Sequence, residues 1–143
     1  MANVSESLGW DPGEYSHRAV LEEVELGGSG VTYAPGEIVT FSGINAAGQM
    51  KAVKLPAGNI LDIPRGVIAK GQGGDSGEIK AIVVSGDVVA KVGAAMTAGQ
   101  PLRTKGGKLV PDGTGTSSLF TCGFVRGVPT TDGDYVLICF KSN

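Results

Sequence analysis

The stretch that decides the fold runs from Glu78 to Val92 and reads Glu-Ile-Lys-Ala-Ile-Val-Val-Ser-Gly-Asp-Val-Val-Ala-Lys-Val. Its two ends, Glu78–Val84 and Val88–Val92, are rich in β-branched residues, which favour strands. Ser85-Gly86-Asp87 lies between them and predicts a turn or a bulge. We therefore expect strand structure on both sides of this interruption.

Shorter strand-like runs recur along the chain and are separated by turns about every 8–12 residues. The expected strands are Gly36–Ser42, Gln49–Leu55, Gly66–Lys70, Pro101–Thr104, Lys108–Val110, Ser118–Arg126 and Asp134–Lys141. The 143 residues include 24 glycines and 7 prolines, which suit tight turns. They exclude a helical bundle, because each interior glycine costs a helix about 1 kcal/mol. We expect an all-β domain over residues 35–143, a small β-barrel or sandwich of short strands.

Residues 1–34 differ in composition and are predicted to form an N-terminal arm. Ser16 is a candidate N-cap, and two valines one turn apart predict a short helix over 17–26. Gly27-Gly28-Ser29-Gly30 then predicts a flexible joint. Aromatic and apolar residues on such a segment are typical interface anchors, and the alternative is an arm packed on its own barrel as a static cap. The candidate interface residues are Trp10, Tyr15, Val20, Leu21 and Val24.

Motifs that would support catalysis or cofactor binding are incomplete. Gly74-Asp75-Ser76-Gly77 resembles the nucleophile loop of chymotrypsin-like proteases, but the single histidine, His17, lies in the predicted arm. Gln49-Met50-Lys51-Ala52 is similar to the Met-Lys motif of biotinyl and lipoyl carrier domains, but its lysine follows the turn instead of standing at the tip. One histidine and two distant cysteines make no zinc site. We therefore expect no catalytic, metal or cofactor site.

Charge and hydropathy limit the partners of the protein. The net charge is −2, and no stretch concentrates lysine or arginine, so we expect no nucleic-acid partner. No apolar run approaches the roughly 20 residues that span a bilayer, and the first residues do not resemble a secretory signal. Cys122 and Cys139 lie in apolar runs and predict buried thiols in a reducing compartment, with a cross-strand disulfide as the alternative.

The order of elements after Gly66 carries a family resemblance. The elements are Gly66–Lys70, a glycine-rich loop, Glu78–Gly86, Ala94–Leu102, Lys105–Pro111, Phe124–Gly127 and Asp134–Ile138. In this order they resemble the capsid cement (decoration) proteins of tailed bacteriophages. The element Ala-Gly-Gln-Pro-Leu, followed by Gly-Gly-Lys-Leu-Val-Pro, is also similar to lambda-type head decoration proteins. The resemblance covers about residues 35–143.

The resemblance implies a structural β-barrel-like protein, usually trimeric, on the outer surface of the capsid. Such proteins sit at or near three-fold sites, bridge major capsid proteins and stabilise the head against the pressure of packaged DNA. The implied partners are the major capsid protein and two further copies of the chain, without nucleic acid, membrane or cofactor. The implied location is the virion, after synthesis in the host bacterial cytoplasm. The alternative is a soluble β-barrel carrier or ligand-binding module, with the glycine loop at 71–77 near its site or a covalent group on Lys51.

Overall fold

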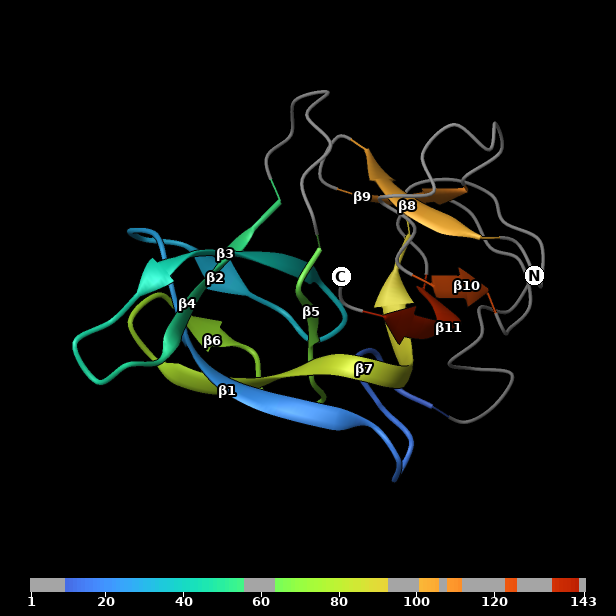
Figure 1. Ribbon diagram of the computed structural model, residues 1–143, viewed down its shortest axis with the longest axis horizontal. Helices are drawn as coiled ribbons and strands as arrows, with labels where there is room; N and C mark the ends of the chain where they lie inside the picture. Colours follow the sequence, from blue (N-terminus) through green and yellow to red (C-terminus); the bar gives the residue numbers. More distant parts are fainter. Residues whose placement is uncertain are drawn as a thin grey trace.

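The computed structural model describes residues 10–55, 64–92, 101–105, 108–111, 123–125 and 135–141. Within these ranges the chain forms eleven strands and no helix, so the all-β prediction is confirmed (Figure 1). The strands are β1 (Val20–Leu26), β2 (Thr32–Tyr33), β3 (Ile38–Ile44), β4 (Met50–Lys54), β5 (Gly66–Ile68), β6 (Gly74–Asp75), β7 (Ile79–Lys91), β8 (Leu102–Lys105), β9 (Lys108–Pro111), β10 (Gly123–Val125) and β11 (Tyr135–Lys141). None of the described residues forms a helix that is long and apolar enough to cross a membrane.

Five strands close into a small barrel, which confirms the predicted architecture. They follow one another in the order β1-β4-β3-β5-β7, and β7 pairs back with β1. The ring contains one parallel pair, between β1 and β4, and its other pairs are antiparallel. Closure removes the free sheet edges that a flat sheet of these strands would expose.

Strand β7 connects the barrel to the rest of the sheet. Its first half pairs with β1 and β5, and its second half pairs with β11 from Ser85 to Lys91. Against β1, Val20 is opposite Ser85 and Leu21 is opposite Val83, so one β7 residue is skipped. The interruption expected near this point is therefore a bulge and not a turn. In Figure 1 β7 runs from the barrel to β10 and β11.

The alternation of side chains in β7 builds two hydrophobic cores on opposite sides of one wall. Ile82 points into the barrel, and its neighbour Val83 packs in a second core outside it. The barrel core consists of Val24, Leu26, Tyr33, Val39, Ala52, Ile68 and Ile82. The second core includes Ile38, Val67, Val83, Val88, Leu102, Leu109, Val136, Ile138 and Phe140. The β8–β9 hairpin and β11 are thereby packed against the outside of the barrel.

The helix predicted over 17–26 is wrong, because most of that segment is β1. Val24 and Leu26, two residues apart, are fully buried in the barrel core, while Glu22 and Glu23 are exposed. A spacing of two is the strand period, and pairing with β7 satisfies the backbone that a helix would have satisfied internally. Strand β1, residues 20–26 of the predicted arm, is therefore one of the five barrel strands, and Tyr33 of β2 packs in the barrel core.

The prediction that Cys139 is a buried core thiol is also wrong. Cys139 is half-buried, whereas its neighbours in the alternation of β11, Ile138 and Phe140, are buried in the second core. The thiol therefore lies on the opposite face of β11 from that core. Cys122 lies outside the described residues.

Candidate functional site

The segment before β1 is held along the second half of β7 by backbone hydrogen bonds. The Gly13 amide donates to the Val89 carbonyl at 2.8 Å, and the Val89 amide donates to the Glu14 carbonyl at 3.0 Å. The Ser16 amide donates to the Asp87 carbonyl at 3.0 Å, and Tyr15 forms an isolated bridge with Val88. This part of the chain is therefore an added strand-like layer beside β7.

A small ion-pair group fastens the same segment to the loop after β5. Lys70 Nζ lies 2.8 Å from Asp11 Oδ2 and 3.5 Å from Glu14 Oε1. The hydrogen bond with Asp11, followed by the charges of Asp11 and Glu14, raises the pKa of Lys70. All three side chains are substantially exposed, so the pairs orient the segment more than they stabilise it.

The structure separates the five predicted interface residues into two groups. Tyr15, Val20 and Leu21 expose 38%, 54% and 36% of their surfaces, and Trp10 is half-buried. Val24 is 0% exposed and packs in the barrel core, so it belongs to the core and not to an exposed stripe. Val20 lies opposite Ser85 and Tyr15 opposite Val88, three residues apart on β7, which is about 10 Å of strand. We call Tyr15, Val20 and Leu21 the N-terminal apolar surface.

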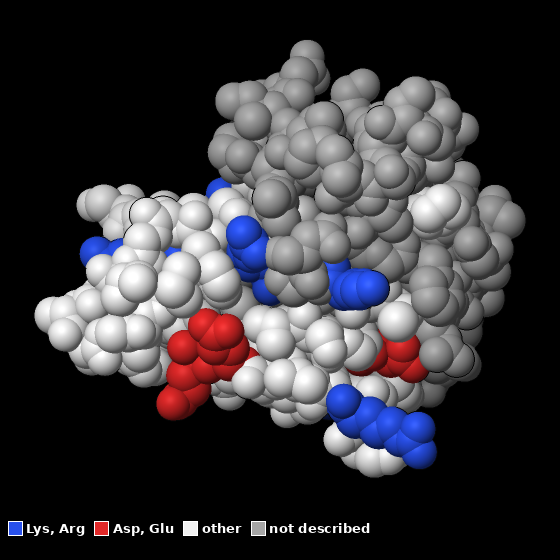
Figure 2. Space-filling model, in the orientation of Figure 1, with Lys and Arg blue, Asp and Glu red and all other residues white. Residues whose placement is uncertain are grey.

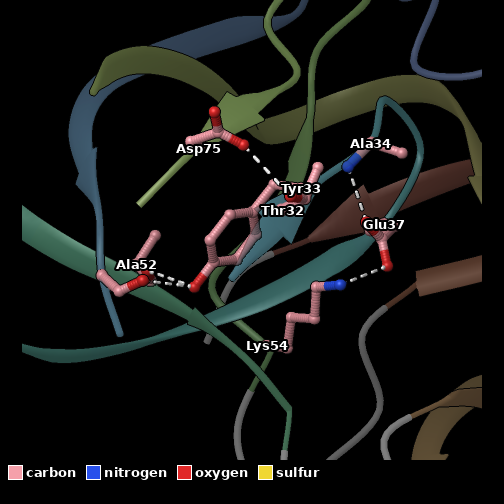
Figure 3. A network of polar contacts seen from close by, with 8 residues as sticks. Thr32, Tyr33, Ala34, Glu37, Ala52, Lys54 and Asp75 are labelled. Atoms are coloured by element: carbon pink, nitrogen blue, oxygen red, sulfur yellow. Dashed lines mark hydrogen bonds and ion pairs between the residues drawn. The ribbon is translucent and has the colours of Figure 1, made fainter. Parts of the chain in front are cut away.

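A second group of polar residues lies around the buried Tyr33 (Figure 3). Tyr33 is buried, and its hydroxyl donates a hydrogen bond to the carbonyl oxygens of Gly27, at 2.9 Å, and Ala52, at 3.3 Å. Lys54 Nζ lies 5.5 Å from the centre of the Tyr33 ring and 3.4 Å from Glu37 Oε2. Burial raises the pKa of Tyr33, and the charge of Glu37 adds to the rise against an opposing hydrogen bond with the Lys54 backbone.

Beside this group lies a pocket of about 130 Å³. It is lined by Glu37, Ile38, Lys54, Lys91 and Lys108, which come from β3 and the residue before it, β4, β7 and β9. On the face drawn in Figure 2, basic side chains lie near the middle, at the left edge and at the lower right, with acidic side chains between them. We call this the lysine pocket.

Backbone contacts bring together the three chain segments that carry Glu37, Lys91 and Lys108. The Lys91 amide donates to the Gly36 carbonyl at 2.9 Å, which brings the end of β7 beside the residue before Glu37. Val92 and Leu109 form a parallel bridge, so the residues that precede them, Lys91 and Lys108, are neighbours on adjacent segments of the chain. Sequence reasoning missed this group because its members are far apart in the chain and meet only after the barrel closes.

The residues of the incomplete catalytic and carrier motifs have structural positions. The Ser76 hydroxyl accepts a hydrogen bond from the Val31 amide at 3.3 Å, and the Ser76 amide donates to the Val31 carbonyl at 2.9 Å. Ser76 lies just before the start of β7. His17 lies near the middle of β7, because it follows Ser16, which is bonded to Asp87. The β7 segment between these two places, from Ile79 to Ser85, spans about 20 Å. The two side chains therefore do not form a nucleophile–base pair.

Lys51 of the carrier-like motif lies within β4, half-buried, opposite Glu25 on one side and Gly43 on the other. It does not stand at the tip of the β3–β4 hairpin, where a carrier lysine is modified. In the part of the chain that the structure describes, no three His, Cys, Asp or Glu side chains gather as metal ligands.

Comparison with known proteins gives a fold relation. No protein-family model matches the chain, and no curated protein matches its sequence. The chain is similar to the crystal structure of the N base of head fiber gp8.5 of bacteriophage phi29, with a TM-score of 0.60 and 16% sequence identity. The match covers 85% of this chain and 93% of that one. At this level of identity the likeness establishes a shared fold, and function has to be argued from the surface of this chain.

Proposed function

We propose that this protein is a structural component of a phage head that binds the outer surface of the capsid as a cement or decoration protein. The observation that carries the proposal is the fold likeness to the base of a phage head fiber over 85% of the chain. The order of motifs after Gly66, which resembles decoration proteins, points to the same class independently of the fold. In this role the chain acts as a trimer at or near three-fold sites and bridges neighbouring major capsid proteins.

The physical properties of the barrel suit a mechanical role. The barrel is closed and shares one wall with a second core, so a load applied at one face passes through packed side chains. A trimer multiplies weak contacts, because the second and third chains bind at a high effective concentration. The mild net acidity, −2, disfavours contact with packaged DNA.

The N-terminal apolar surface is the proposed contact with the capsid. Val20 and Leu21 are large apolar side chains left exposed at the start of a strand whose other end is in the core. Tyr15 lies three β7 residues away, and Trp10 precedes it in the same segment. Aromatic residues with neighbouring aliphatic ones are the usual anchors of protein interfaces.

Binding to expanded phage heads tests the proposal. Purified protein is mixed with heads of the phage that encodes it, and the bound fraction is measured by sedimentation and by cryo-electron microscopy. We expect saturable binding, extra density at or near three-fold sites and a mass in solution or on the particle of three times 14.5 kDa. Heads that take up no protein would overturn the proposed function.

Matched variants locate the contact. Val20→Ser and Leu21→Ser should lower occupancy of the heads by about tenfold, while the fold is retained because both side chains are exposed. Ile44→Ser is the control, since Ile44 is 64% exposed but lies in the β3–β4 hairpin. Equal occupancy by all three variants and the original protein would place the contact elsewhere.

A further inference from the structure

Strand β1 is longer than the part of it that closes the barrel. On one side β1 pairs with β7 along its length. On the other side, within the described ranges, it pairs only through Glu25 and Leu26, which lie opposite Lys51 and Ala52 of β4. Residues 20–23 therefore form a strand edge that β4 does not cover, and in Figure 1 β1 extends past β4 along the lower side of the molecule.

The hydrogen bonds between β1 and β7 fix the direction of each backbone group on β1. The Leu26 amide donates to the Glu78 carbonyl at 2.9 Å, so Leu26 bonds toward β7. In an antiparallel pair every second residue does so, which assigns Val24 and Glu22 to the same direction. The odd-numbered residues of β1 therefore point their N–H and C=O groups away from β7.

The odd-numbered residues face the side on which β4 lies. The Gly27 amide, which continues their series, donates to the Ala52 carbonyl of β4 at 2.7 Å. Leu21 and Glu23 point the same way, but they precede the residues at which β1 meets β4. They present two N–H and two C=O groups that no described strand pairs, and an extended segment of another protein can add to such an edge as a further strand.

The side chains along this edge determine which strand fits it. Val20 and Leu21 are 54% and 36% exposed, and Glu22 and Glu23 are exposed as well. The ion pairs of the described residues include neither glutamate. The edge thus offers two apolar side chains followed by two carboxylates.

A second copy of the chain does not suit this edge. Two β1 edges form all four backbone hydrogen bonds only when Leu21 of each copy lies opposite Glu23 of the other. That register places Glu22 directly opposite Glu22, and like charges in this position are destabilising. The charge pattern therefore favours a different, basic strand.

We infer that residues 20–23 of β1 bind an extended segment of a partner protein, which adds as an antiparallel strand and carries two basic residues followed by two apolar ones. The basic residues lie opposite Glu23 and Glu22, and the apolar residues lie opposite Leu21 and Val20. Backbone hydrogen bonds supply affinity, and the opposite charges fix the register. The inference refines the contact at the N-terminal apolar surface, and it rests on the proposed function only for the identity of the partner.

Hydrogen exchange measured by NMR on the full chain tests the inference. The probe is a disulfide-closed β-hairpin peptide with one strand that reads Lys-Lys-Val-Val and has the amides of its first lysine and first valine on the free edge. In the free protein we expect rapid exchange at the Leu21 and Glu23 amides and slow exchange at the Glu22 and Val24 amides. At a peptide concentration ten times the dissociation constant, exchange at Leu21 and Glu23 should slow by about tenfold.

Two altered peptides and two protein variants separate backbone pairing from charge. N-methylation of the two free-edge amides should abolish binding, as should the replacement of both peptide lysines by glutamate. Glu22→Gln combined with Glu23→Gln should weaken binding by about fivefold. The control is Glu78→Gln, at the other end of β1, because Glu78 is exposed and glutamine retains an acceptor for the Asp75 amide. The control should bind the peptide as the original protein does.

Several results would overturn the inference. Slow exchange of the Leu21 and Glu23 amides in the free protein would show that the edge is already covered. Unchanged exchange with the peptide, equal binding of either altered peptide, or an equal loss in the Glu78→Gln control would also refute it. If phage heads take up the protein while the hairpin does not bind, the inference fails and the proposed function stands. Binding of the hairpin without uptake by heads refutes the proposed function alone.

Discussion

Replacing one leucine near each end of β1 tests whether this strand is part of the hydrophobic core, because the two replacements can be compared by the unfolding free energy that each one removes. Leu26 is 0% exposed and packs in the barrel, whereas Leu21, in the same strand, is 36% exposed. Leu26→Ala and Leu21→Ala make the same chemical change in the same element. Any difference between their effects therefore reports burial and not the strand preference of alanine.

The expected magnitudes follow from the two environments. Leu26→Ala removes three buried carbon atoms at about 0.8 kcal/mol each, or about 2.4 kcal/mol, and the cavity left behind brings the loss of unfolding free energy to about 3–4 kcal/mol. At Leu21 the site is open to solvent and keeps no enclosed cavity, so we expect a loss of about 1.5 kcal/mol or less. For 143 residues, 1 kcal/mol is about 3 °C of melting temperature, which predicts decreases of about 10 °C and at most about 5 °C.

Thermal and urea unfolding, followed by circular dichroism, measure both variants against the original protein. Leu26→Met is the control for the site, because a volume-conserving exchange should cost less than about 1.5 kcal/mol. If Leu26→Ala lowers stability no more than Leu21→Ala does, β1 is not a core strand. In that case residues 1–30 should also be removable without loss of the fold.

Other consequences of the structure can be tested on single residues. Tyr33→Phe removes a buried hydroxyl that donates to a backbone carbonyl and should cost about 1–2 kcal/mol in urea unfolding, with the fold unchanged. Burial raises the pKa of Tyr33 and Tyr135, so the unfolded chain releases its phenolic protons first. The contribution of these two tyrosines to the unfolding free energy is fully present below about pH 10 and is lost as the pH rises above it, so stability should fall there, and less so in the Tyr33→Phe variant. An equal fall with and without Tyr33 would contradict the burial of its ring. Gly13→Ala should cost several times more than Gly48→Ala in thermal unfolding: both glycines have left-handed φ angles, +79° and +85°, but only at Gly13 would a new Cβ lie 2.6 Å from the Ile68 carbonyl oxygen. Equal costs would show that the segment around Gly13 is not held against β5.

The proposed contact surface was only partly predictable. Tyr15, Val20 and Leu21 are exposed, as an interface requires, but Val24 is not. A spacing of four residues places Val20 and Val24 on one face of a helix, and because four is an even number it places them on one face of a strand as well. The spacing therefore does not distinguish the two structures. Which face is buried depends on where the strand enters the barrel, and only Val24 lies far enough along β1 to do so.

Composition and residue pattern determine much of this protein by local physics. The β-branched run of β7, its bulge near Gly86 and the frequent glycine turns specify short strands, because these preferences act within a few residues of chain. Tertiary structure decided what happens between distant segments. β1 is a strand because β7 and β4 offer it backbone partners, and the lysine pocket exists because barrel closure and the bridge to Leu109 bring β3, β4, β7 and β9 to one place. Those pairings are non-local, so their free energy is gained only once the whole barrel has formed.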